Sequence, residues 1–231
     1  MFIVKALLAS SLQLAIIAAL LILPAGLAAG DWGWACGWIY LAAYAVALYG
    51  STVVLALWAP ASLEARMQAP TSEAQPRDDK IATTILLSVL VGYFIFVPLD
   101  ALVWQILGVP AEPVSWIGLV ASYFGYFFVV WTIFTNSFAK PIVEDQSDEG
   151  QMLIDSGPYE MVRHPMYLGM LVMLAGMGLW LQSLASLPLI GVVVAAMALR
   201  IVVEERVLLQ TLEGYRDYQA RCRTRLLPFV W

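Results

Sequence analysis

Six long apolar stretches constrain the fold of this chain more than any other feature of its sequence. The first four are long enough to cross a bilayer as helices, because a helical span takes about 20 residues. The last two are shorter, and the Gln182-Ser183 pair and Pro188 that break them fit a tight helical hairpin. We therefore expect an all-α integral membrane protein with about six transmembrane helices. The stretches cover about residues 6–29, 35–58, 81–107, 114–138, 165–181 and 185–203.

The composition supports this interpretation. Hydrophobic residues make up 61% of the chain and charged residues 13%, whereas about a quarter of the residues in a soluble domain are charged. Six spans of about 20 residues would occupy roughly half of the sequence, and the short loops and polar tail that remain leave no room for a second globular domain. We expect one domain over residues 1–231, with four helices in 1–138 and the functional half in 139–231.

The basic residues predict the orientation of the helices. With the N-terminus inside, all 12 lysines and arginines fall on inner segments or on helix ends that face inside. The three outer loops, around Asp31, Glu112 and Gln182, contain none. Cytoplasmic loops of membrane proteins carry an excess of Lys and Arg. We therefore expect both termini to be cytoplasmic and the protein to lie in the inner membrane of a bacterium.

The first apolar stretch has a second interpretation. A positively charged start at Lys5 and small residues at Ala28-Ala29-Gly30 are also features of a cleaved signal peptide. The apolar run is longer than a usual signal core, so we expect a retained transmembrane helix. The sequence leaves the alternative open.

The remaining polar residues argue against several kinds of site. The net charge is −5 and no basic patch stands apart from the membrane-flanking positions, which argues against a nucleic-acid partner. Cys36 and Cys222 are expected on opposite sides of the membrane, so they cannot pair, and their spacing matches no metal site. The segment 59–80 is predicted to be a solvated connector without chemistry. Asp100, at the outer end of the third helix, is expected to reach water; a buried functional carboxylate is the alternative.

Residues 150–169 do not behave like a simple connector. They contain the only histidine of the chain, His164, beside Arg163 and with a tyrosine on either side. Pro165 fits the first turn of the following helix, where its missing N–H is no loss. His164 then lies at the start of that helix, where unpaired N–H groups and the helix dipole favour an anionic ligand group. In the alternative, Arg163 and His164 only anchor the helix at the lipid headgroups.

The end of the last apolar stretch, Arg200-Ile-Val-Val-Glu204-Glu205-Arg206, is the second unusual segment. Arg200 and Glu204 are four residues apart and share one helix face. Arg200 still lies within the apolar run, where ionisable residues are costly and usually line a cavity or site. The alternative is a helix-end salt bridge with a snorkelling arginine. Adjacent carboxylates point to different faces, so Glu205 need not share the role of Glu204.

These two segments are expected on the same side of the membrane, at adjacent helix ends. They would bring arginine, histidine, tyrosine and carboxylate groups to one polar mouth at the bilayer surface. Such a mouth would be open to a water-soluble cofactor on one side and to a lipid-soluble substrate on the other.

Several spaced motifs occur in order along residues 140–231. They are Gly157-Pro158-Tyr159, Arg163-His164-Pro165-Met166-Tyr167-Leu168-Gly169, Arg200 with Glu204-Glu205, Tyr215-Arg216-Asp217-Tyr218 and Leu226-Leu227-Pro228-Phe229-Val230-Trp231. Together they resemble the isoprenylcysteine carboxyl methyltransferase family, to which phospholipid N-methyltransferases are related. The first four predicted helices share only hydrophobicity with that family.

This resemblance implies an integral membrane enzyme that uses S-adenosylmethionine (SAM) and releases S-adenosylhomocysteine. The cofactor would lie between the last helices and a cytoplasmic C-terminal helical cap. Arg200 matches the substrate-contacting arginine of the family, and Arg200 and Glu204 would be the catalytic residues. Family members often have histidine where Gln151 stands. The cofactor-binding residues implied by the resemblance are Gln151, Met152, Leu153, Ile154, Tyr159, His164, Pro165, Met166, Tyr167, Glu204 and Glu205.

The sequence leaves the methyl acceptor open, although the acceptor is expected to be lipophilic or embedded in the membrane. A carboxylate acceptor needs only a cation such as Arg200 to orient it. An amine or thiol acceptor must lose a proton, which Glu204, Glu205 or His164 could accept. The alternative from another class is a non-catalytic membrane ligand-binding protein or a transporter. A transporter, however, is expected to place ionisable residues near the midplane of the bilayer.

The predicted orientation can be tested by cysteine labelling. Single cysteines at positions 31 and 112 should react with a membrane-impermeant reagent from outside, and one at position 72 only from inside, because the basic residues flank the inner segments. Labelling would be compared between intact and opened cells. Reaction at position 72 in intact cells would contradict the six-span orientation.

Overall fold

The computed structural model describes residues 2–68, 75–138, 151–227 and 231. All regular elements in these ranges are helical, and no strand occurs among them. In chain order the elements are α1 (Phe2–Ala29), α2 (Ala35–Trp58), α3 (Pro60–Arg66), α4 (Arg77–Leu99), the π-helical turn η1 (Asp100–Trp104), α5 (Glu112–Thr135), α6 (Pro158–Met161), α7 (Pro165–Trp180), α8 (Ser186–Thr211) and α9 (Tyr215–Arg221).

Each of the six predicted apolar stretches corresponds to a helix. Five helices are long and apolar enough to cross a membrane, namely α1, α2, α4 with η1, α5 and α8. The sixth, α7, is apolar but has only 16 residues, which at 1.5 Å per residue gives about 24 Å, less than the hydrocarbon core. The prediction of an all-α integral membrane fold is therefore confirmed, with α7 as a shorter member of the bundle.

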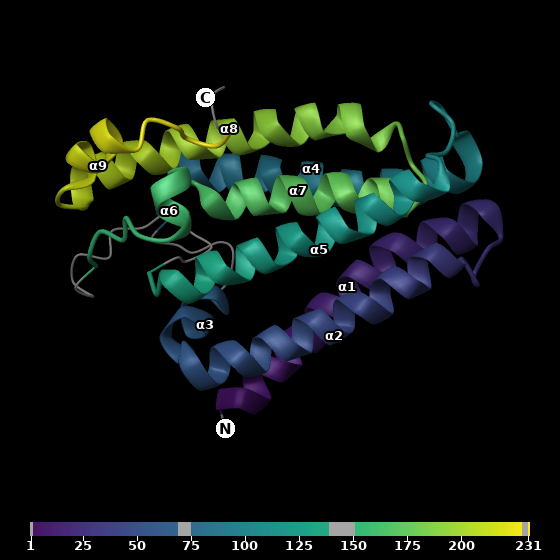
Figure 1. The fold of residues 1–231 in the computed structure, drawn as a ribbon, viewed down its shortest axis with the longest axis horizontal. Coiled ribbons are helices and arrows are strands. Elements are labelled where there is room, and N and C mark those ends of the chain that lie inside the picture. Colours follow the sequence, from purple (N-terminus) through teal and green to yellow (C-terminus); the bar gives the residue numbers. More distant parts are fainter. Residues whose placement is uncertain (1, 69–74, 139–150, 228–230) are drawn as a thin grey trace.

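The long helices form one layered bundle (Figure 1). α4, α5, α7 and α8 run side by side, with α7 between α5 and α8, while α1 and α2 pair with each other and cross the bundle obliquely. The short helices α3, α6 and α9 lie at one end, and the α1–α2, α4–α5 and α7–α8 connections lie at the other. Cys36 and Cys222 are both free cysteines.

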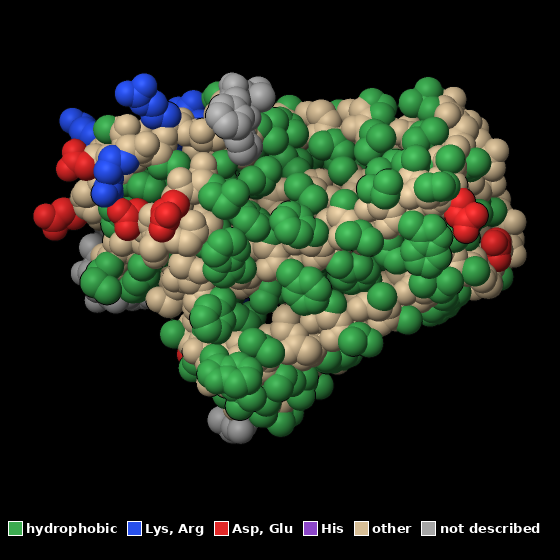
Figure 2. All heavy atoms as spheres, viewed as in Figure 1, with side chains coloured by type: hydrophobic (Ala, Val, Ile, Leu, Met, Phe, Trp, Pro, Cys, Tyr) green, Lys and Arg blue, Asp and Glu red, His purple; other side chains and the backbone are tan. Residues whose placement is uncertain are grey.

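Charged side chains are concentrated at the end that holds the short helices. Figure 2 shows Lys, Arg and acidic side chains grouped there, acidic side chains at the far end, and hydrophobic side chains over most of the surface between. Many of these hydrophobic side chains are large and exposed, such as Leu27, Val46 and Val120. An exposed apolar band of this kind suits contact with lipid chains. Position 72, chosen above for labelling, lies outside the described residues.

Glycines allow α5 and α7 to approach until their backbones touch. A Cβ atom built on Gly176 of α7 would lie 2.4 Å from the Gly118 carbonyl oxygen and 2.4 Å from the Ser122 nitrogen of α5. One built on Gly125 of α5 would lie 2.5 Å from the Gly169 carbonyl oxygen of α7. In a membrane no hydrophobic force drives helices together, because lipid chains are as apolar as the helix surfaces. Small residues at helix interfaces therefore commonly serve to allow close packing. This contact fixes where α7 begins, and therefore where His164 lies.

The segment 59–80 was predicted to be a solvated connector without chemistry, and for its described residues this prediction is wrong. Residues 60–66 form α3, and Arg66 at its end is only partly exposed. Gln75 is 4% exposed and Asp79, in the first turn of α4, is 0% exposed. Turn-rich composition indicated a loop, but tertiary packing buries the polar groups at both of its ends.

The expectation that Asp100 reaches water is also wrong. Asp100 is 0% exposed, and its Oδ2 accepts a hydrogen bond of 2.6 Å from Ser183 Oγ. Its Oδ1 accepts a hydrogen bond of 2.9 Å from the Ile106 backbone N–H. The Asp100 carboxylate therefore joins the α7–α8 connection, through Ser183, to the α4–α5 connection, through Ile106.

We predict that Gly176→Ala destabilises the protein by about 1–3 kcal/mol, because the added methyl group overpacks the α5–α7 contact. Gly191→Ala in α8 is the matched control, since a Cβ there would meet no atom within 4 Å and alanine favours helix. Thermal unfolding of both variants in detergent measures the difference. Equal unfolding temperatures for both would show that α5 and α7 are not packed through this glycine.

Candidate active site

The loop before α7 is held in place by the C-terminal segment. The Arg163 N–H donates to the Thr224 carbonyl at 2.9 Å, and the His164 N–H donates to the Arg225 carbonyl at 2.9 Å. Pro165 is the first residue of α7, a position where its missing backbone N–H would have no partner within the helix. The side chains of Arg163 and His164 are thereby directed into the bundle, where both residues are buried.

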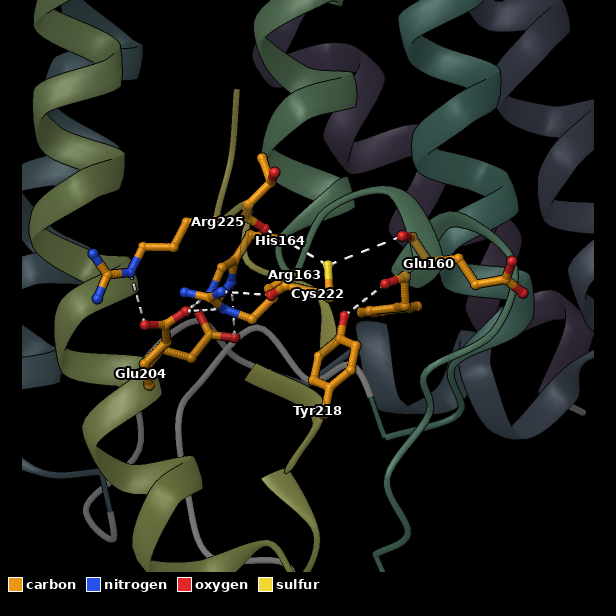
Figure 3. Close-up of polar contacts among 10 residues, drawn as sticks. Glu160, Arg163, His164, Glu204, Tyr218, Cys222 and Arg225 are labelled. Atoms are coloured by element: carbon orange, nitrogen blue, oxygen red, sulfur yellow. Dashed lines mark hydrogen bonds and ion pairs between the residues drawn. The ribbon is translucent and has the colours of Figure 1, made fainter. Parts of the chain in front are cut away.

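The Glu205 carboxylate is the centre of the polar network at this end of the bundle (Figure 3). Arg163 donates from Nε to Glu205 Oε1 at 2.7 Å, and Arg225 donates from Nε to Oε2 at 2.9 Å. His164 Nε2 lies 3.3 Å from Oε1. Arg163 also donates from Nη1 to the Cys222 carbonyl at 2.7 Å. The Glu205 side chain is only 5% exposed, so α8, the loop before α7 and the C-terminal segment meet at one buried charge.

The neighbouring Glu204 lies in a different environment. Its side chain is 27% exposed, and its Oε2 accepts a hydrogen bond of 3.3 Å from the Tyr167 hydroxyl. Its Oε1 lies 3.8 Å from His164 Nδ1. The His164 and Tyr167 rings stack with centroids 5.9 Å apart. His164 therefore lies between two carboxylates, one buried and fully engaged and one that solvent can reach.

The Arg200 side chain contacts Asp79 of α4. Arg200 Nε lies 3.4 Å from Asp79 Oδ1, with side chains 11% and 0% exposed. The sequence analysis did not identify Asp79 as part of the site. The available signal was its helical register, since Asp79 lies on the same face of α4 as the buried residues Thr83 and Leu86.

Arg66 is a second contributor that sequence reasoning missed. Burial lowers the pKa of its guanidinium below the usual value, the charge of Arg200 acts in the same direction, and the Glu204 carboxylate acts in the opposite direction. Arg66 at the end of α3 therefore belongs with these groups. We call them the polar cluster, which comprises Arg66, Asp79, Arg163, His164, Tyr167, Arg200, Glu204, Glu205 and Arg225. Nothing in the local sequence distinguishes it from other basic residues of the predicted loop.

The C-terminal helix α9 covers the segment that precedes α6. Tyr215 and Tyr218 of α9 are buried, and Leu153 and Tyr159 pack against them. The Tyr218 hydroxyl donates to the Tyr159 carbonyl at 2.7 Å, and Asn136 donates to the Tyr159 hydroxyl at 2.9 Å. Burial raises the pKa of Tyr159 to about 12. This arrangement is a helical cap over part of the predicted cofactor segment.

The other predicted cofactor residues lie along the approach to this cap. Gln151 and Ile154 are half-buried, whereas Met152 is 68% exposed. Pro165 is buried at the start of α7 and Met166 is half-buried beside it. The structure thus brings His164, Tyr167 and Glu204 into one cluster and places Leu153 and Tyr159 against α9, while Met152 is exposed.

Residues 114–214 match the phospholipid methyltransferase family. This part of the chain is similar to the phospholipid methyltransferases. The predicted resemblance is thereby confirmed, because that family includes isoprenylcysteine carboxyl methyltransferase-like proteins. The match supports a membrane methyltransferase. No curated protein matches the chain.

The part that matches the phospholipid methyltransferases runs from α5 through α8 and supplies most of the polar cluster. His164, Tyr167, Glu204 and Glu205 all lie within it. Other members of the cluster come from outside the matched part, since Arg66 precedes it in α3, Asp79 precedes it in α4 and Arg225 follows it. Helices α3 and α4 and the C-terminal segment therefore complete a site whose centre lies in the matched part.

An apolar groove of about 610 Å³ lies between α4 and α8, on a different face of α8 from the one that carries Arg200 and Glu205. Its α8 residues, including Leu199 and Val202, are on the exposed side of that helix, whereas Arg200 and Glu205 are on the buried side. The groove is therefore separate from the polar cluster. Its lining residues are Asp78, Ile81, Ala82, Ile85, Ala195, Ala198, Leu199, Val202, Val203 and Arg206.

We predict that Glu205→Gln destabilises the protein by about 3–5 kcal/mol, because it leaves Arg163 as a buried charge without its carboxylate. Glu213→Gln, at an exposed position after α8, is the matched control and should be neutral. Thermal unfolding in detergent and protease resistance of the C-terminal segment report the effect. A Glu205→Gln protein that unfolds with the control would contradict the central role of this carboxylate.

Proposed function

We propose that this protein is an integral membrane methyltransferase that uses SAM and acts on a lipophilic or membrane-embedded acceptor. The observation that carries the proposal is the convergence of His164, Tyr167 and Glu204 at the start of α7 and the end of α8. These residues lie within the part that matches the phospholipid methyltransferases.

The chemistry of the cluster fits SAM, which carries a sulfonium and an ammonium cation together with a carboxylate. Glu204 offers a carboxylate that solvent can reach, and the rings of Tyr159 and Tyr167 can attract a cation over their faces. The segment 151–154 would lie along the ligand, with Pro165 and Met166 at the mouth of α7. When bound, the cofactor supplies a methyl group on a good leaving group.

Methyl transfer of this kind requires positioning more than acid–base chemistry. The protein must hold the acceptor in line with the methyl group, and such orientation lowers the barrier strongly. Arg200 is the cation suited to orient the acceptor. If the acceptor is an amine or thiol, Glu204 is the better proton acceptor of the two carboxylates, because both Glu205 oxygens already accept from arginines.

We further propose a location in the inner membrane of a bacterium, with both termini cytoplasmic and a lipid as the acceptor. The grouping of charged side chains at the end that holds α9 supports this orientation. In this arrangement the cap formed by α9 faces the aqueous source of the cofactor. The lipid acceptor reaches the cluster from the bilayer.

The direct test is incubation of the purified protein with methyl-labelled SAM and a membrane lipid extract. We expect label in the lipid fraction and none with protein that carries Glu204→Gln together with Arg200→Lys. Identification of the labelled lipid names the acceptor. Binding of SAM without transfer to any fraction would favour a ligand-binding protein or an inactive relative, and no SAM binding would contradict the proposal.

We predict that substitutions of Glu204 and Arg200 on α8 impair different steps, the first cofactor binding and the second turnover. Glu204→Gln should weaken SAM binding about tenfold, or about 1.4 kcal/mol, because the accessible carboxylate is lost. Arg200→Lys keeps the charge but loses the planar guanidinium, so SAM affinity should be preserved while kcat falls. Arg206→Lys, at an exposed position of the same helix, is the control.

These outcomes separate a site from a structural salt bridge. Calorimetric titration gives SAM affinity, the labelled assay gives kcat, and thermal unfolding gives stability. If both variants lost SAM affinity, kcat and stability in parallel, the two residues would be structural, and their assignment to cofactor and acceptor would be wrong.

A further inference from the structure

We propose that Asp79 is a positioning residue that fixes the Arg200 guanidinium in the orientation required by the acceptor. The inference rests on the proposed function, because it assigns Asp79 a part in the same reaction. Asp79 belongs to α4 and lies outside the part that matches the phospholipid methyltransferases.

The contacts of Asp79 join it to α8 and to the residues just before α4. Its Oδ1 lies 3.4 Å from Arg200 Nε on α8, and its Oδ2 accepts a hydrogen bond from Gln75 Nε2. Gln75 also lies 3.3 Å from Thr83 Oγ1, one turn further along α4. Asp79 is 0% exposed. Its carboxylate is therefore held on both oxygens before any ligand arrives, and so is the arginine that it contacts.

The neighbouring Asp78 shows that this burial is not a general property of the start of α4. Both residues are in the first turn, where the helix dipole favours carboxylates. Asp78 pairs with Arg206 at 3.6 Å, and these side chains are 68% and 61% exposed. Exposed pairs of this kind contribute little. α4 thus presents two carboxylates to two arginines of α8, and only the Asp79–Arg200 pair lies in the polar cluster.

A purely stabilising role explains the buried pair poorly. Removing two charges from water costs free energy that their attraction only partly returns, so well-packed apolar residues would often serve stability as well or better. An arginine has a long side chain that loses rotamer freedom when it binds a ligand. A guanidinium that is already oriented binds its ligand with a smaller loss, which is an advantage for a residue that must align a reacting group.

The test is a double-mutant cycle on turnover with the full-length protein in detergent. Asp79→Asn keeps the shape of the side chain and removes its charge, and it should lower kcat at least tenfold while the SAM dissociation constant changes less than about twofold. In an Arg200→Lys background the same substitution should change kcat less than about twofold, because residues that act through one another are not additive. Asp78→Asn is the matched control and should leave kcat unchanged.

The outcomes separate this proposal from the proposed function. If the wild-type protein transfers no methyl group from SAM, the proposed function is contradicted and the positioning role with it. If the wild type is active and Asp79→Asn turns over normally, or adds its full effect to Arg200→Lys, only the positioning role is overturned. A parallel loss of SAM affinity and kcat in Asp79→Asn would likewise overturn it, since that is the mark of a structural defect.

A second variant covers the case in which Asp79→Asn does not fold. Asp79→Glu keeps the charge but lengthens the side chain by one methylene, so it should displace the guanidinium while the buried arginine stays paired. A lowered kcat with preserved SAM affinity supports the positioning role. Wild-type kcat in a folded Asp79→Glu protein would overturn it.

Discussion

The pairing of the buried Glu205 carboxylate with two arginines is the interaction on which the rest of this end of the molecule depends. A charge that is removed from water must be paired and hydrogen-bonded, and here the partners are Arg163 and Arg225, with His164 alongside. These partners come from the loop before α7 and from the C-terminal segment. Satisfying one carboxylate therefore brings three distant parts of the chain together and sets the His164 ring between Glu205 and Glu204.

The division of labour between the two adjacent glutamates follows from this pairing. Because both Glu205 oxygens are engaged, its neighbour Glu204 is the carboxylate that remains partly open to solvent. One residue organises the backbone while the next can meet a ligand. The same helix end could not provide both roles if the two side chains shared a face, and consecutive residues of a helix do not.

Local patterns predicted what depends on local sequence. Apolar run length predicted the six helices, and the family resemblance implied a site that includes His164, Tyr167 and Glu204, which the structure does bring together. Glu205 was grouped with the cofactor residues, but its carboxylate is occupied by two arginines. The arginine partner Arg225 was not foreseen, because its contact with Glu205 depends on how the C-terminal segment packs back against α8.

Residues outside the family-like part were the hardest to predict. Asp79 and Arg66 stand in a segment whose turn-rich composition indicated a solvated loop. Asp79 is buried because α4 packs against α8, and Arg66 is partly covered where α3 packs against α2 and α5. Asp100 was expected to reach water because it lies at the outer end of the third predicted helix. No periodicity reveals such a contact, since the two partners are more than 80 residues apart in each case. The burial of these polar groups at helix ends depends on tertiary contacts and cannot be predicted from the local sequence.

The glycine contact between α5 and α7 has a consequence for motion. At Gly118, Gly125 and Gly176 the two helices lie so close that even a methyl group would clash with the other helix, so at these points no longer side chain can change rotamer and let them slide apart. They should therefore move as one rigid body. If the polar cluster must open to admit a lipid, the displacement has to occur in α4 or α8, or in the cap formed by α9, and the pair α5–α7 serves as the fixed frame against which those elements shift.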